Sequence, residues 1–103
     1  MKLTEVTKWE GSSFHGTTIY TTPQRLIDLA ESNNISYNEY NDGSDKTNFD
    51  FSFQVGEDLQ FTVYDWKEYR ELNLDREYCF HIGGIDKSST EEGKDILTKL
   101  IES

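Results

Sequence analysis

The segment Phe49-Asp50-Phe51-Ser52-Phe53-Gln54-Val55 limits the possible folds of this chain more than any other stretch. Apolar and polar side chains alternate along it, which is typical of a strand with one buried face. The same alternation returns in residues 61–66 and 77–82, on either side of a charged stretch that we predict to be a long hairpin loop. Gly83-Gly84 is expected to end the last strand. The sequence therefore predicts a three-stranded antiparallel meander.

Two amphipathic helices are predicted outside this meander. Thr22 before Pro23 is a helix start, because the Thr side chain can cap the first turn and proline needs no donor there. Ser89-Thr90-Glu91-Glu92 fits a capping box with Ser89 as the N-cap. An apolar stripe follows it at helical spacing. A short β-prone run, residues 17–20, precedes the first helix.

These elements predict the order β-α-β-β-β-α in a single α+β domain that covers residues 1–103. The expected architecture is a two-layer sandwich, an antiparallel β-meander with two helices on one face, because both helices must bury their stripes on the Phe face. The opposite face carries Tyr64 and Trp66, and we expect it to be a wet surface or the interface of a homo-oligomer. The predicted core consists of Leu26, Leu29, Phe51, Phe53, Phe61, Val63, Phe80, Leu97 and Leu100.

The charge of the chain restricts its partners. Twenty acidic and ten basic residues give a net charge of −10, which opposes binding to nucleic acid or to an anionic membrane. The sequence has no membrane-span pattern and no signal-peptide pattern, so we expect a cytoplasmic protein. An acidic surface also leaves open a second interpretation, in which the chain imitates nucleic acid.

The sequence predicts no enzyme, no metal site and no cofactor. Cys79 and His81 share a strand face, but about 6–7 Å of backbone separates them, which is long for a nucleophile and its base. Their spacing from His15 matches no standard metal site, and one cysteine cannot form an intramolecular disulfide. The glycine motifs of common phosphate-binding loops do not occur. A small hydrolase is the third functional hypothesis, beside a protein that binds a small anionic ligand and an acidic inhibitor of another protein.

The segment Tyr64-Asp65-Trp66-Lys67-Glu68-Tyr69-Arg70 combines an aromatic ring with two cations. A nucleotide-like anion needs a ring face on which its base can stack and cations for its phosphate. In the alternative interpretation, Trp66 packs structurally, while Lys67 and Arg70 pair with Asp65, Glu68, Glu71 or Asp75. The candidate ligand-binding residues are Lys46, Thr47, Trp66, Lys67, Arg70 and His81.

Three pieces of the sequence, Asp45-Lys46-Thr47, the segment 64–70 and His81-Ile82-Gly83-Gly84, resemble small accessory proteins encoded by tailed bacteriophages. The resemblance extends over most of the chain from about residue 14. It implies a protein that acts in the host cytoplasm against a host enzyme or defence system, in some cases by sequestering a nucleotide signal. The expected partner is therefore a small anionic, nucleotide-like ligand. The alternative partner is a host protein that the acidic surface inhibits.

Overall fold

A computed structural model describes residues 2–6, 11–43 and 47–102. Over these residues the chain forms a five-stranded antiparallel sheet, in the order β1-β5-β4-β3-β2, and two helices. The α+β class is therefore confirmed, with one strand more than the predicted order contained. The elements are β1 (Ser13–Thr21), α1 (Pro23–Ser32), β2 (Tyr37–Glu39), β3 (Phe49–Val55), β4 (Leu59–Tyr64), β5 (Tyr78–Gly84) and α2 (Lys87–Glu102).

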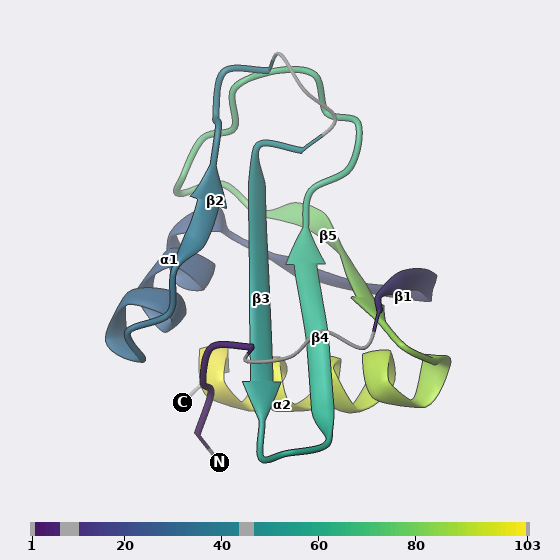
Figure 1. Ribbon diagram of the computed structural model, residues 1–103. Coiled ribbons are helices and arrows are strands. Elements are labelled where there is room, and N and C mark those ends of the chain that lie inside the picture. The colour runs from purple at the N-terminus through teal and green to yellow at the C-terminus, as the bar shows by residue number, and fades with distance from the viewer. Residues whose placement is uncertain (1, 7–10, 44–46, 103) are drawn as a thin grey trace.

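The core lies between one face of the sheet and the helices. Figure 1 shows α2 crossing the sheet near the lower ends of β3 and β4, while α1 lies beside β2. Phe49, Phe51 and Phe53 are fully buried, as the alternation predicted. Residues of both helices join the same cluster, so both helices cover the Phe face. Two predicted core residues, Leu29 and Leu100, are only partly buried at its margin.

The extra strand, β2, lies in the polar segment between α1 and β3, where no strand was predicted. It has only three residues, too few for a readable alternation, and it pairs with the outer edge of β3 through Tyr37 and Phe51. Further along the same edge, Thr4 exchanges two backbone hydrogen bonds of 2.9 Å with Gln54. Long-range pairing with β3 creates this strand, and local sequence does not reveal such pairing.

Strands β1 and β5 are both longer than predicted. β1 spans Ser13–Thr21 and pairs with β5, with a register shift between Phe14 and Thr18. β5 continues through Gly83 and Gly84, where the sequence predicted its end. A Cβ atom at Gly83 would lie 2.6 Å from both Ser12 Oγ and Thr62 Oγ1. Gly83 is thus a site of close approach within the sheet and does not break the strand.

Of the two predicted helix caps, that of α1 is confirmed and that of α2 is wrong. Thr22 Oγ1 accepts a hydrogen bond of 3.1 Å from the Arg25 backbone N–H, which confirms Thr22 as the N-cap of α1. The prediction of Ser89 as the cap of α2 is wrong, because that helix already begins at Lys87. Asp86 Oδ1 instead accepts from the Ser89 backbone N–H at 2.7 Å, and this bond lowers the pKa of Asp86. Of the helices in the described part of the chain, none is long and apolar enough to cross a bilayer.

Candidate functional site

Four aromatic rings gather on the sheet face that the helices leave uncovered. His81 of β5 is at their centre: its ring stacks on Phe14 of β1, with centroids 4.0 Å apart, and on Trp66 at 6.3 Å. Tyr64, the last residue of β4, meets His81 edge-on at 5.6 Å. Phe14 is 44% exposed and Trp66 is 41% exposed. We call these four residues the outer aromatic cluster.

A cavity of about 310 Å³ adjoins the outer aromatic cluster. We call it the outer cavity, and most of its lining side chains carry a hydroxyl group. Two of the hydroxyls, those of Ser12 and Thr62, are 3.1 Å apart above Gly83. The lining residues are Ser12, Ser13, Thr47, Asp50, Thr62, Tyr64 and Trp66.

A larger cavity, of about 820 Å³, lies where the end of β2 faces the loop between β4 and β5. Its charged lining residues are Glu39, Glu71 and Asp75, so it offers carboxylates and no cation. An anionic ligand would be repelled there. The smaller outer cavity is lined by one carboxylate, that of Asp50, and by the Trp66 ring, so we take it as the better candidate site.

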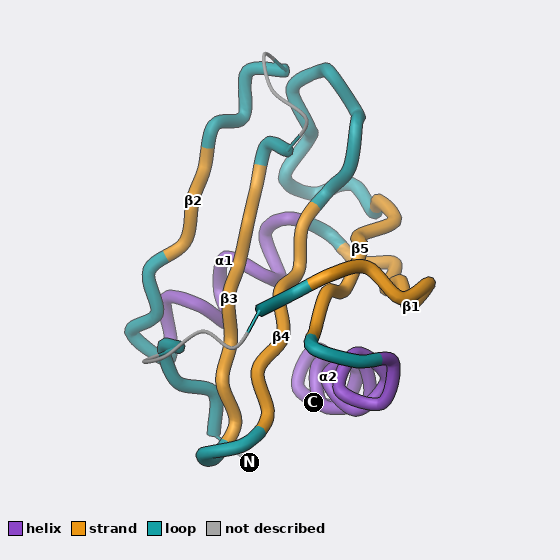
Figure 2. The backbone as a smooth tube through the Cα atoms, turned by 45° about the vertical axis from the view of Figure 1, so that its right-hand side comes forward, coloured by secondary structure: helices purple, strands orange, loops and turns teal. Residues whose placement is uncertain are grey.

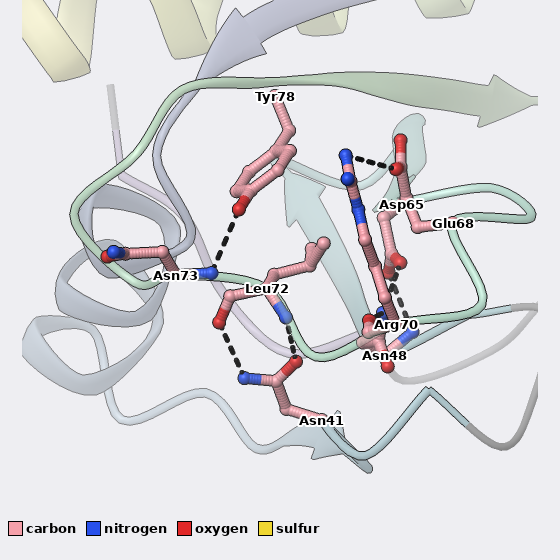
Figure 3. A network of polar contacts seen from close by, with 8 residues as sticks. All are labelled: Asn41, Asn48, Asp65, Glu68, Arg70, Leu72, Asn73 and Tyr78. Atoms are coloured by element: carbon pink, nitrogen blue, oxygen red, sulfur yellow. Dashed lines mark hydrogen bonds and ion pairs between the residues drawn. The ribbon is translucent and has the colours of Figure 1, made fainter.

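Asp65 fixes the two loops that bring Thr47 and Trp66 to the outer cavity (Figure 3). Its carboxylate is fully buried, and its Oδ1 accepts hydrogen bonds of 2.8 Å from the backbone N–H groups of Asn48 and Phe49. Asp65 Oδ2 accepts a third bond, of 3.0 Å, from Asn48 Nδ2. Buried carboxylates are stable when donors satisfy them in this way. Because Asp65 and Asn48 are direct neighbours of Trp66 and Thr47, the network positions both site residues.

The same network holds the long loop between β4 and β5. Asn48 Nδ2 also donates to the Arg70 carbonyl at 2.9 Å, and Asn41 exchanges two hydrogen bonds, of 2.9 and 2.6 Å, with the backbone of Leu72. Lys67 and Tyr69 adopt the left-handed region, with φ of 57° and 52°, which is unfavourable for bulky residues. The hydrogen bonds of Asn41 and Asn48 offset that strain. No local sequence pattern indicates this role, because each partner lies more than one strand away along the chain.

The structure brings together four of the six predicted site residues. Trp66 and Thr47 line the outer cavity, the Lys67 Nζ atom lies 5.5 Å from the centroid of the Trp66 ring, and His81 stacks on that ring. Arg70 is not among the lining residues of this cavity, and its exposed guanidinium pairs with Glu68 at 3.3 Å. The pairing of Arg70 with Glu68 agrees with the alternative interpretation, in which acidic neighbours bind this cation. Asp65, another acid of that interpretation, instead accepts a hydrogen bond from Asn48. The sixth residue, Lys46, is outside the described residues.

Asp50 and Phe14 are two of the site residues that the sequence analysis missed. The others are Ser12, Ser13, Thr62 and Tyr64. Asp50 pairs across the strands with Tyr64, and burial raises its pKa, with the Asp65 carboxylate raising it further. Burial also raises the pKa of Tyr64, helped by the charge of Asp50, and burial lowers the pKa of His81. The site therefore favours a neutral imidazole within the stack of rings. Asp50 could have been found from the alternation of β3, because it lies on the polar face with Ser52.

The side chains of the site offer stacking surfaces and hydrogen-bonding groups. Within residues 2–6, 11–43 and 47–102, no three side chains of His, Cys, Asp or Glu are grouped so that they could hold a metal ion. Cys79 is exposed, and His81, the neighbour considered and set aside as its base, stacks on the rings of Phe14 and Trp66. The aromatic rings can stack on a planar group, while the hydroxyls and Asp50 can exchange hydrogen bonds with it.

No family model, curated protein or solved structure matches this chain.

Proposed function

We propose that the chain is a non-catalytic binding protein that captures a small planar ligand with an anionic end, such as a nucleotide. One observation carries this proposal: an exposed Trp66 ring, backed by His81, forms part of a cavity of about 310 Å³. That volume is at the lower end of the range of about 300–1,000 Å³ that small-molecule sites occupy. A base that stacks on an aromatic side chain gains about 1–3 kcal/mol.

Lys67 is the described cation that is best placed for the anionic end of the ligand. Its Nζ atom lies over the Trp66 ring, 5.5 Å from the ring centroid. A lysine so placed binds phosphate as a point charge. Arg70 is already paired with Glu68, so it takes no part in the proposed site. The resemblance to phage accessory proteins supplies a setting, in which the chain sequesters a nucleotide signal inside the host.

A thermal-shift screen with nucleoside monophosphates, diphosphates and cyclic nucleotides tests this function. A true ligand at 100 times its Kd stabilises the folded chain by about 2.7 kcal/mol, which raises the Tm. Trp66→Ala should weaken binding of that ligand by about 1–3 kcal/mol, because the stacking surface is lost. Tyr40→Ala, which removes an exposed ring that is not part of the outer cavity, is the matched control. If no compound raises the Tm, the proposal is wrong.

A protein partner is the second candidate, because Phe14 and Trp66 expose large rings on one face. Exposed aromatic side chains are enriched among the residues that dominate binding at interfaces. Phe14→Ala separates the two candidates, since Phe14 does not line the outer cavity. Loss of the Phe14 ring should strongly weaken the binding of a protein partner, and it should weaken the binding of a small ligand much less.

A further inference from the structure

Asp50 is a carboxylate at the edge of a cavity, and none of the described residues donates a hydrogen bond to it. It is half-buried on β3, lines the outer cavity and lies across from Tyr64. Within the described part of the chain, no N–H or O–H group donates to its carboxylate and no cation pairs with it. Asp65, which lies near it, shows the opposite arrangement, with three donors on its two oxygens.

A carboxylate that has lost part of its hydration is stabilised by any donor that replaces the lost water. Burial raises the pKa of Asp50, which reflects that loss of hydration. Two of the hydroxyls of the outer cavity are engaged with each other, since the Ser12 and Thr62 side-chain oxygens lie 3.1 Å apart. The missing donor is therefore expected to come from the ligand.

Two parallel N–H donors on one planar edge match the two oxygens of a carboxylate. Guanine carries this pair in its ring N1–H and its 2-amino group. Hypoxanthine keeps the N1–H and lacks the amino group, while adenine presents a lone pair at N1, which a carboxylate repels. These three bases offer nearly the same surface for stacking, so the edge that faces the carboxylate distinguishes them.

On the basis of the proposed function, we propose that Asp50 selects guanine-type ligands. The base stacks on Trp66, and the Asp50 carboxylate accepts hydrogen bonds from both N–H groups of its edge. Both side chains line the same cavity, which places the stacking surface and the acceptor within reach of one small molecule. Asp50 thereby sets the class of ligand, while Trp66 supplies affinity for any planar base.

Calorimetric titration of the full chain with guanosine, inosine and adenosine tests this selectivity. Nucleosides carry no phosphate, so the net charge of −10 does not influence the comparison. We expect guanosine to bind at least about 10-fold more tightly than inosine or adenosine, because a site built for a donor rejects an analogue without it. Asp50→Asn should bring guanosine and inosine to similar affinities. Asp58→Asn, an exposed acid in the turn between β3 and β4, is the matched control and should keep the preference.

The outcomes separate this inference from the proposed function. Similar affinities of all three nucleosides for the parent chain, with binding lost in Trp66→Ala, would overturn the role of Asp50 and leave the binding function intact. A guanosine preference that survives in Asp50→Asn would likewise overturn the role of Asp50 and leave the binding function intact. If none of the nucleosides and none of the nucleotides binds, both the proposed function and the selectivity are wrong.

Discussion

Asp50 and Asp65 show how differently two neighbouring carboxylates can affect one fold. Asp65 is fully buried and accepts hydrogen bonds from two backbone N–H groups and one amide. Asp50 is half-buried, and its raised pKa means that folding favours its protonated form. The first acid fastens the loops around the site, whereas the charge of the second acid opposes folding at neutral pH.

Asp50→Asn should therefore stabilise the chain near neutral pH. For a carboxyl group whose pKa is raised by folding, the stabilising contribution is present below the unfolded pKa and is lost as the pH rises through the folded pKa. We expect the Tm of Asp50→Asn to exceed that of the parent at about pH 7, and the difference to vanish at about pH 3, where the acid is protonated in both states. Thermal melts at both pH values measure this. A variant that is less stable than the parent at about pH 7 would contradict it.

Packing between elements depends on one small residue of α2. A Cβ atom at Gly93 would lie 2.7 Å from Cγ of Phe61, a fully buried ring of β4. The glycine lets the helix backbone approach the sheet closely. Neither the helix stripe nor the strand alternation requires a glycine at this position, so this close contact is visible only in the fold.

Gly93→Ala should destabilise the chain, although alanine is the better helix former by about 1 kcal/mol. The added methyl group must displace the Phe61 ring or the helix, and overpacking of this kind costs about 1–3 kcal/mol. Urea unfolding measures the difference, with exposed Lys94→Ala on the same helix as a control for propensity. A Gly93→Ala variant as stable as this control would show that α2 can shift away from β4 at no cost.

Features that repeat locally could be predicted from the sequence, and features made by distant partners could not. The alternation of β3 predicted its buried Phe residues, and Thr22-Pro23 predicted the start of α1. The grouping of Trp66 with His81 also followed from strand faces. In contrast, β2 depends on pairing with β3, and the placement of Arg70 depends on a loop that Asn48 and Asn41 hold from another part of the chain.

At the scale of the whole molecule, β1 is an edge strand. It pairs with β5 on one side, and within the described residues no strand lies on its other side (Figure 2). An open edge presents unpaired backbone groups to a second chain. The net charge of −10 on each copy opposes such contact at low ionic strength.

We therefore expect a homodimer that forms more readily as salt is added. Salt screens the repulsion between copies, since the Debye length falls from about 30 Å at 0.01 M to about 8 Å at 0.15 M. Static light scattering at high micromolar concentration should show the mass rising from 12.0 kDa towards about twice that value with increasing salt. A mass that stays at 12.0 kDa under all these conditions would rule out the dimer.

The pairing of β1 with β5 also determines when the site comes into existence during folding. β3 and β4 are joined by a short turn and can form early, whereas β1 must find a strand that lies almost sixty residues further along the chain. Ser12 and Ser13 reach the outer cavity, and Phe14 reaches His81, only through that late step. A half-folded chain consequently has no complete site. A ligand of the proposed site would bind only the finished sheet, and its binding would therefore stabilise the folded chain against the loss of β1.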